Sequence, residues 1–72
     1  MNLTQVNEGQ EYIIEKVNTQ DEEMDNFLFS LGCYSGESIT VVSRKKKSCV
    51  VSIKDSRYCI DSELAAAIEI FE

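Results

Sequence analysis

The chain contains no histidine among its 72 residues. Catalytic Ser-His-Asp and Cys-His arrangements need that side chain, and so do metal sites with histidine ligands, so these kinds of site are excluded. Gly32 and Gly36 are not followed by the Lys-Ser or Lys-Thr pair of a phosphate-binding loop. A small chain without a base, nucleophile or cofactor motif is typical of a binding module, and we expect no enzymatic activity.

Long apolar runs are also missing. The longest uninterrupted run covers residues 64–68, far short of the roughly 20 residues that cross a bilayer as a helix. The chain does not begin with a basic segment followed by an apolar one, as a secretory signal does. We therefore expect a cytosolic protein that does not insert into a membrane.

Segments rich in proline or serine are absent, and no internal repeat is present. The composition, 43% hydrophobic and 28% charged, is that of an ordinary globular protein. A chain of this length forms one small domain, near the lower size at which a core alone stabilises a fold. We expect a single domain over residues 1–72.

The three cysteines form no C-x-x-C pair. Their number and spacing argue against a disulfide framework and against a ribbon-type zinc site. We expect Cys33, Cys49 and Cys59 to be reduced core thiols, since free cysteine behaves as a small buried hydrophobe. The alternative is a soft metal site, in which Cys49 and Cys59 lie side by side on neighbouring strands with nearby carboxylates. Outside that alternative we expect no metal and no cofactor.

The formal net charge of −6 disfavours a nucleic-acid ligand, because affinity for phosphate backbones comes largely from lysine and arginine. Four of the seven basic residues are consecutive, Arg44-Lys45-Lys46-Lys47, so the rest of the chain carries −10, from −6 minus four. Two interpretations stay open. The run is a solvated hairpin tip that discourages edge pairing, or a contact patch for an acidic partner or anionic lipid headgroups.

One helix is predicted in the first half of the chain. Four apolar residues at i, i+3, i+4 and i+7 form one helical face, which we expect to be buried: Met24, Phe27, Leu28 and Leu31. The T-x-x-E pattern of Thr19 and Glu22 predicts a capping box with Thr19 at the N-cap. Gly32 predicts the helix end, because a left-handed residue there costs a glycine little.

The remaining segments predict strands. The strand-like segments are residues 12–17, 38–43, 49–54, 57–60 and 68–71, and the second and third flank the basic run as a hairpin. Asp61 or Ser62 is expected to cap a single helical turn over residues 63–66. The fold is thus mainly β with one α-helix after the first long strand. Five short strands in so small a chain bury their apolar face by closing, or nearly closing, into a barrel.

The middle of the chain carries a family resemblance. The pattern L-x-x-L-G-x-x-x-G-x-x-I, formed by Leu28, Leu31, Gly32, Gly36 and Ile39, resembles the core signature of the FeoA family, small cytosolic proteins of bacterial ferrous iron uptake. The resemblance runs nearly end to end and implies an SH3-like barrel. It also implies a partner, the cytosolic part of a FeoB-type membrane transporter. Related SH3-like barrels are appended to iron-dependent repressors, which implies the alternative of a metal-sensing or metal-carrying regulatory module that takes Fe²⁺.

Tyr34 is the strongest candidate for a partner contact. It lies in a turn between two glycines, and its amphipathic ring suits an interface. Phe29, off the apolar helical face, is expected to join it in an exposed patch. The full predicted partner surface combines this hinge with the basic run: Leu28, Phe29, Leu31, Gly32, Tyr34, Gly36, Arg44, Lys45, Lys46 and Lys47.

Overall fold

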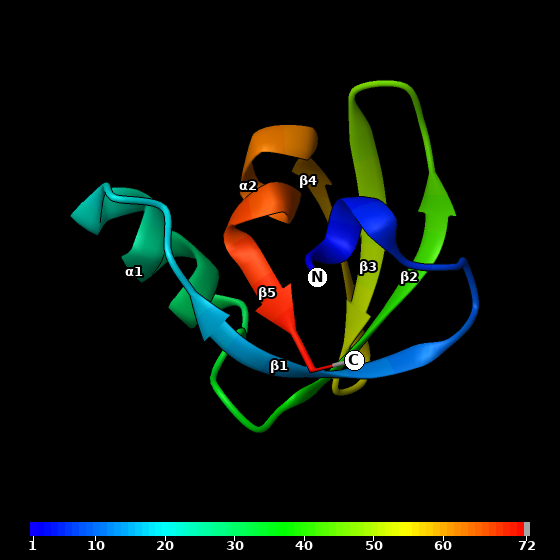
Figure 1. The fold of residues 1–72 in the computed structure, drawn as a ribbon, viewed down its shortest axis with the longest axis horizontal. Coiled ribbons are helices and arrows are strands. Elements are labelled where there is room, and N and C mark those ends of the chain that lie inside the picture. The colour runs from blue at the N-terminus through cyan, green and yellow to red at the C-terminus, as the bar shows by residue number, and fades with distance from the viewer. Residues whose placement is uncertain (72) are drawn as a thin grey trace.

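Five antiparallel strands form one curved sheet with a helix beside it in the computed structural model, which describes residues 1–71 (Figure 1). The elements in chain order are η1 (Leu3–Gln5), β1 (Glu11–Val17), α1 (Glu22–Ser30), β2 (Ser38–Arg44), β3 (Ser48–Ile53), β4 (Ser56–Asp61), α2 (Ser62–Ala67) and β5 (Ile68–Ile70). The predicted fold class, mainly β with a helix after the first long strand, is confirmed. Within the described residues, no helix has the length and apolarity needed to cross a bilayer.

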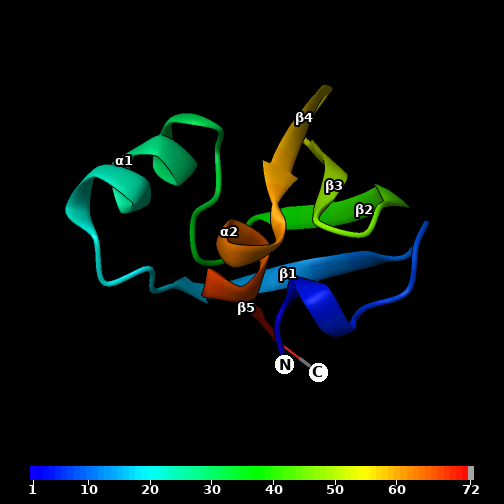
Figure 2. The ribbon, with the colours of Figure 1, turned by 90° about the horizontal axis from the view of Figure 1, so that it is seen from above.

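Strand β1 belongs to both halves of the barrel. Its first half pairs with β2, where Tyr12 lies opposite Ile39, and its second half pairs with β5, where Val17 lies opposite Ile68. The strand order is β4-β3-β2-β1-β5, so β4 and β5 are the two edges. Helix α2 connects these edges and lies between them (Figure 2). The barrel is therefore nearly closed, with α2 covering the gap.

The barrel interior is filled by alternate residues of the strands. In the β2–β3 hairpin, Ile39 and Val41 face inward, as their alternation predicts, and Val41 lies opposite the buried Val51. None of the polar or charged residues in the described part of the chain is buried. The core consists of Leu3, Val6, Ile14, Leu28, Cys33, Ile39, Val41, Cys49, Val51, Ile53, Ile60, Ala65, Ile68 and Ile70.

Helix α1 begins two residues later than the T-x-x-E pattern predicts. Asp21 is the N-cap, and its Oδ1 accepts hydrogen bonds from the N–H groups of Glu23 at 2.9 Å and Met24 at 3.5 Å. The Thr19 hydroxyl instead accepts from the Asp21 N–H at 3.1 Å and donates to the Asp25 carboxylate at 2.6 Å. The predicted Thr19 cap is wrong because this side chain orders the approach to the helix while the Asp21 carboxylate caps it.

The end of α1 is as predicted. Gly32 has a φ of +100°, and the N–H of Cys33 donates to the Leu28 carbonyl at 3.1 Å while that of Gly32 donates to Phe29 at 3.0 Å. These two bonds form a Schellman motif, which satisfies carbonyls that the last helical turn leaves free. Gly36, at φ +91°, then turns the chain into β2.

The apolar face of α1 is not buried as a whole, contrary to prediction. Leu28 is fully buried, but Met24 is 45% exposed and Phe27 is 46% exposed. Figure 1 shows why, since α1 lies to one side of the barrel instead of along its wall. The helical period identifies an apolar face correctly, but only the part near the hinge meets the core.

Candidate functional site

The rings of Phe29 and Tyr34 stack on the surface where α1 ends. Their centroids are 5.9 Å apart and their planes differ by 10°. Phe29 is 38% exposed and Tyr34 is 47% exposed, so the stacked pair presents aromatic area to solvent. The exposed patch that the sequence predicts at these two residues is therefore formed.

Lys54, in the turn between β3 and β4, joins this pair. Its Nζ lies 6.0 Å from the centroid of the Tyr34 ring, at the outer limit of a cation–π contact. We call Phe29, Tyr34 and Lys54 the hinge surface. Sequence analysis missed Lys54 because it lies 20 positions from Tyr34 along the chain. Gly32 lies close to the end of β3, since a Cβ added there would lie 3.2 Å from Ile53 Cγ2 and 3.9 Å from Lys54 Cε.

Backbone hydrogen bonds hold the loop that carries Tyr34. Its N–H donates to the Gly32 carbonyl at 3.0 Å, and its carbonyl accepts from Glu37 at 3.1 Å. The N–H of Gly36 donates to Ile14 of β1 at 2.8 Å. The ring is thus displayed on a loop fixed to the barrel, which reduces the conformational entropy that binding would cost.

Three residues in the hinge half of the predicted partner surface are buried or partly buried. Leu28 is fully buried, so its prediction as a partner contact is wrong, since a buried side chain cannot touch a partner. Leu31 is partly buried and packs against the core. Gly32 is also partly buried and carries no side chain, whereas Gly36 is exposed.

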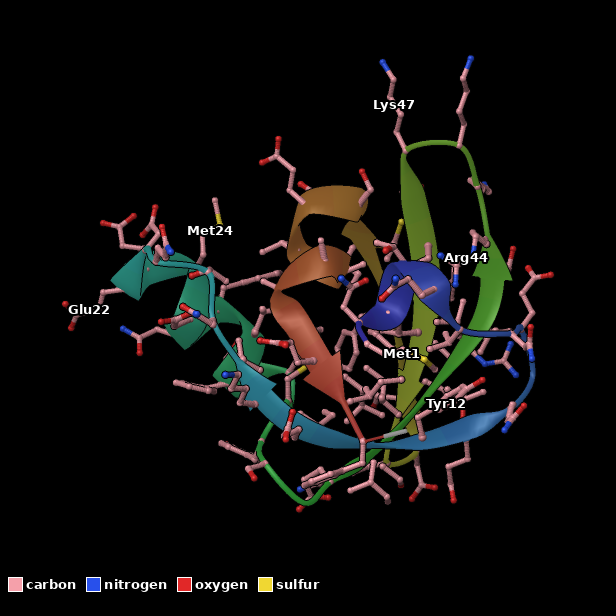
Figure 3. The ribbon with its side chains drawn as sticks, viewed as in Figure 1. Met1, Tyr12, Glu22, Met24, Arg44 and Lys47 are labelled. Atoms are coloured by element: carbon pink, nitrogen blue, oxygen red, sulfur yellow. The ribbon has the colours of Figure 1, made fainter. Side chains whose placement is uncertain are left out.

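The two halves of the predicted partner surface are separate. The tip of the β2–β3 hairpin and α1 lie on different sides of the molecule (Figure 1). Lys45, Lys46 and Lys47 are exposed, and Lys47 extends away from the barrel (Figure 3). Arg44 is half-buried and differs from them, because its Nη2 donates to the carbonyls of Leu3 at 2.8 Å and Val6 at 2.9 Å.

An open groove lies between α1 and α2. Its volume is about 370 Å³, and Met24 of α1 faces it together with Leu64 of α2. Asp21, Asp61 and Glu63 bring carboxylates to the same groove. The complete lining is Asn18, Thr19, Asp21, Met24, Asp61, Glu63, Leu64, Ala66 and Ala67. Met24, one of the exposed residues on the apolar face of α1, thus borders an acidic groove, which sequence analysis did not predict.

Cys49 and Cys59 lie on neighbouring strands, as expected, but their thiols face opposite sides of the sheet. Cys49 pairs with Ile60 and is buried, whereas Cys59 pairs with Val50 and is exposed. No cluster of three cysteine, aspartate or glutamate residues suited to a metal ion occurs in residues 1–71. The side-by-side arrangement of the metal alternative is therefore wrong. Burial raises the pKa of the third thiol, Cys33, from 9.0 to about 11, which disfavours its metal-binding thiolate form.

The nearly closed five-stranded barrel, with an inserted helix and a displayed aromatic pair, defines an SH3-like domain. A sequence model described as the FeoA domain matches residues 1–71. The chain belongs to the FeoA family.

Solved structures show the same fold. The structure of an iron uptake regulatory protein (FeoA) superimposes with a TM-score of 0.87 at 20% identity, covering 97% of this chain and 93% of that one. FeoA of Stenotrophomonas maltophilia, solved with zinc and described as an SH3 domain protein, superimposes with a TM-score of 0.89 at 17% identity. The match covers 99% of this chain and 89% of that one. A manganese-dependent transcriptional repressor gives 0.85 at 20% identity, covering 94% of this chain and 39% of the repressor. Among curated proteins, none matches this sequence.

Proposed function

We propose that this chain is a cytosolic accessory protein of ferrous iron transport that binds the cytosolic part of a FeoB-type transporter. It catalyses no reaction and carries no resident cofactor. Membership of the FeoA family supports the assignment to iron transport. The Stenotrophomonas maltophilia relative is itself described as a possible activating factor of bacterial ferrous iron transport.

The stacked pair of Phe29 and Tyr34 carries the proposal that the protein acts by binding another protein. Aromatic residues with an apolar face and a polar end dominate the energetics of protein interfaces. Tyr34 offers such a ring, nearly half exposed, on a loop that backbone hydrogen bonds hold in place. The Lys54 ammonium beside it offers a charge for a carboxylate at the rim of the contact.

The alternative of a metal-sensing module has less support from the residues. Its candidate thiols, Cys49 and Cys59, face opposite sides of the sheet. A metal ion would need ligands that converge on one point, and no three cysteine, aspartate or glutamate residues within residues 1–71 form such a group. We therefore place partner binding first.

A titration of the ¹⁵N-labelled protein with the GTP-binding domain of a FeoB-type transporter tests the proposal. We expect amide shifts that saturate and that cluster at residues 28–36 and at Lys54. The same titration with Fe²⁺ in place of the domain is the control for the alternative. Absence of shifts up to about 1 mM domain, the weak end of specific affinity, would contradict partner binding. Saturable Fe²⁺ shifts around one set of carboxylates or thiols would favour the metal alternative.

A further inference from the structure

The guanidinium of Arg44 is fixed at the base of the β2–β3 hairpin without a carboxylate partner. Nη2 donates to the backbone carbonyls of Leu3 and Val6. The nearby carboxylate of Glu8 accepts from the Arg44 backbone N–H at 2.6 Å. Within residues 1–71 no carboxylate forms an ion pair with Arg44, and Nε and Nη1 have no acceptor. The charge is therefore held in place but not neutralised.

Arg44 lines a cavity of about 230 Å³, which we call the hairpin-base cavity. Three of its lining residues are cationic, three carry hydroxyl groups, and none is a carboxylate. The lining consists of Thr4, Arg44, Lys45, Lys46, Ser48, Cys49, Ser62 and Ala65. Lys47 does not line it and extends away from the barrel (Figure 3).

The thiol in this cavity adds no negative charge. Burial, the largest effect, raises the pKa of Cys49, and the positive charge of Arg44 opposes that rise. Because the pKa is raised overall, the thiol stays neutral near pH 7. Asp61, next to lining residue Ser62, accepts at its Oδ1 from the Leu64 N–H at 2.8 Å. Like Glu8, it is engaged with the backbone.

We propose that the hairpin-base cavity binds a small oxyanion of the phosphate class, held by Arg44 and by the lysines that line the cavity. Nη2 already donates to two carbonyls, which fix the position of the guanidinium, and Nε and Nη1 remain as charged donors for phosphate oxygens. The volume is below the roughly 300–1,000 Å³ of pockets for drug-sized ligands, so it suits a phosphate group and not a whole nucleotide. The phosphate group comes either from a free ion or from a lipid headgroup. This inference does not depend on the proposed transporter partner.

Titration with inorganic phosphate tests the site, with sodium chloride adjusted to keep the ionic strength constant. We expect saturable amide shifts at Lys45, Lys46, Ser48 and Ser62. The Kd should lie below about 10 mM, which is at most about ten times the roughly 1 mM at the weak end of specific binding. Shifts that rise linearly and equal those caused by chloride alone would overturn the proposal.

Matched variants separate a site from general attraction. Lys46→Gln and Lys47→Gln remove the same charge from adjacent positions, but only Lys46 lines the cavity. We expect Lys46→Gln to weaken phosphate binding about threefold, the size of an exposed ion pair, and Lys47→Gln to leave it nearly unchanged. Ser62→Asp, which places a carboxylate in the lining, should abolish saturation. Equal effects of the two lysine variants would overturn the proposal.

Vesicles distinguish the two sources of phosphate. The protein is sedimented with phosphatidylcholine vesicles that contain phosphatidylglycerol. Sedimentation that is lost in Lys46→Gln and kept in Lys47→Gln would assign the cavity to a lipid headgroup. Saturable phosphate shifts without sedimentation would assign it to a free ion. Absence of both saturable shifts and Lys46-dependent sedimentation would overturn the site, while leaving the transporter titration unaffected.

Discussion

The ring of Phe29, in the last turn of α1, lies nearly parallel to the ring of Tyr34 in the loop that follows, with 10° between their planes. The helix end and the loop thus display one continuous aromatic surface. Gly32 stands between them with a left-handed backbone, which brings the two rings to the same side. The stacking of Phe29 on Tyr34 is therefore a product of the Schellman motif that ends the helix.

Replacing the Tyr34 ring should weaken partner binding more than it weakens the fold. We expect Tyr34→Ala to lower the affinity for the FeoB-type GTP-binding domain about fivefold or more, since central aromatic residues commonly contribute more than about 1 kcal/mol. The free energy of unfolding should fall by less than about 1.5 kcal/mol, the upper value of an aromatic pair. Calorimetric titration and urea denaturation measure the two quantities. Tyr34→Phe keeps the stacked ring and is the control; equal loss in both variants would contradict a role for ring stacking.

Truncating Leu28 should destabilise the protein far more than truncating its neighbour Phe27. Leu28 is fully buried, and Leu→Ala at such a site costs about 2–5 kcal/mol. Phe27 is 46% exposed, so Phe27→Ala should cost less than about 1 kcal/mol. Urea denaturation of both variants measures the contrast. Because Leu28→Ala alone can unfold a domain of this size, Leu28→Met, expected to cost less than about 1.5 kcal/mol, keeps the site measurable. Similar losses for Leu28→Ala and Phe27→Ala would contradict the position of α1, in which Leu28 is buried and Phe27 is exposed.

Two glycines with the same backbone hand should respond differently to alanine. Gly32→Ala and Gly36→Ala both force a left-handed alanine, at about 1–2 kcal/mol each. The new Cβ at position 32 would also lie 3.2 Å from Ile53 Cγ2, whereas that at position 36 meets nothing within 4 Å. We therefore expect the larger loss of unfolding free energy for Gly32→Ala. Equal losses in chemical denaturation would show that Ile53 moves aside without cost.

Thiol reactivity should distinguish the cysteines by burial. Cys33 and Cys49 are buried and Cys59 is exposed. We expect an aromatic disulfide reagent at pH 8 to modify Cys59 in the native protein, and all three thiols in denaturant. Cys59→Ser should then show almost no fast native reaction. A second fast thiol in Cys59→Ser would contradict the burial of the other two.

Cys33 should also make stability depend on alkaline pH. The unfolded thiol ionises near its ordinary pKa of 9.0, whereas burial raises the pKa of the folded thiol to about 11. Below pH 9 both states keep the proton, and the contribution to stability is fully present. Between these values the unfolded chain loses the proton first, so stability falls with rising pH, by up to about 1.4 kcal/mol per pH unit. Urea denaturation from pH 8 to 11 should show a shallower fall for Cys33→Ala. Identical slopes would contradict the raised pKa.

Local features were the most predictable from the sequence. The alternation of Ile39 and Val41 predicted the inward face of β2, and the position of Gly32 predicted the end of α1. Asp61 was one of two expected caps for α2, and its side chain accepts from Leu64. Each of these features depends on residues close together in the sequence, where backbone geometry leaves few alternatives.

Features set by contacts across the chain were not predictable. Helical periodicity showed that Met24 and Leu28 share a face, but it cannot show which part of that face meets the barrel. Arg44 was counted with the lysines of the tip, yet its side chain binds the Leu3 carbonyl, 41 positions away. Thr19 and Asp21 both suit an N-cap, and the choice depends on hydrogen bonds among side chains. Composition and residue spacing do not show which side chains come into contact in the folded chain.

The attachment of α1 has a consequence for local opening. Within the described chain, Leu28 is the buried residue of this helix, whereas the rest of the core comes from the strands, η1, α2 and the connecting segments. The helix can therefore undock and fray without breaking a strand ladder, as a cooperative unit of lower stability than the barrel. The amide hydrogens of α1 should exchange with solvent by sub-global opening. Those of β3, which pairs with β2 on one side and β4 on the other, should require global unfolding. A partner bound across the hinge surface would contact both α1 and the barrel. The two would then unfold together as one cooperative unit.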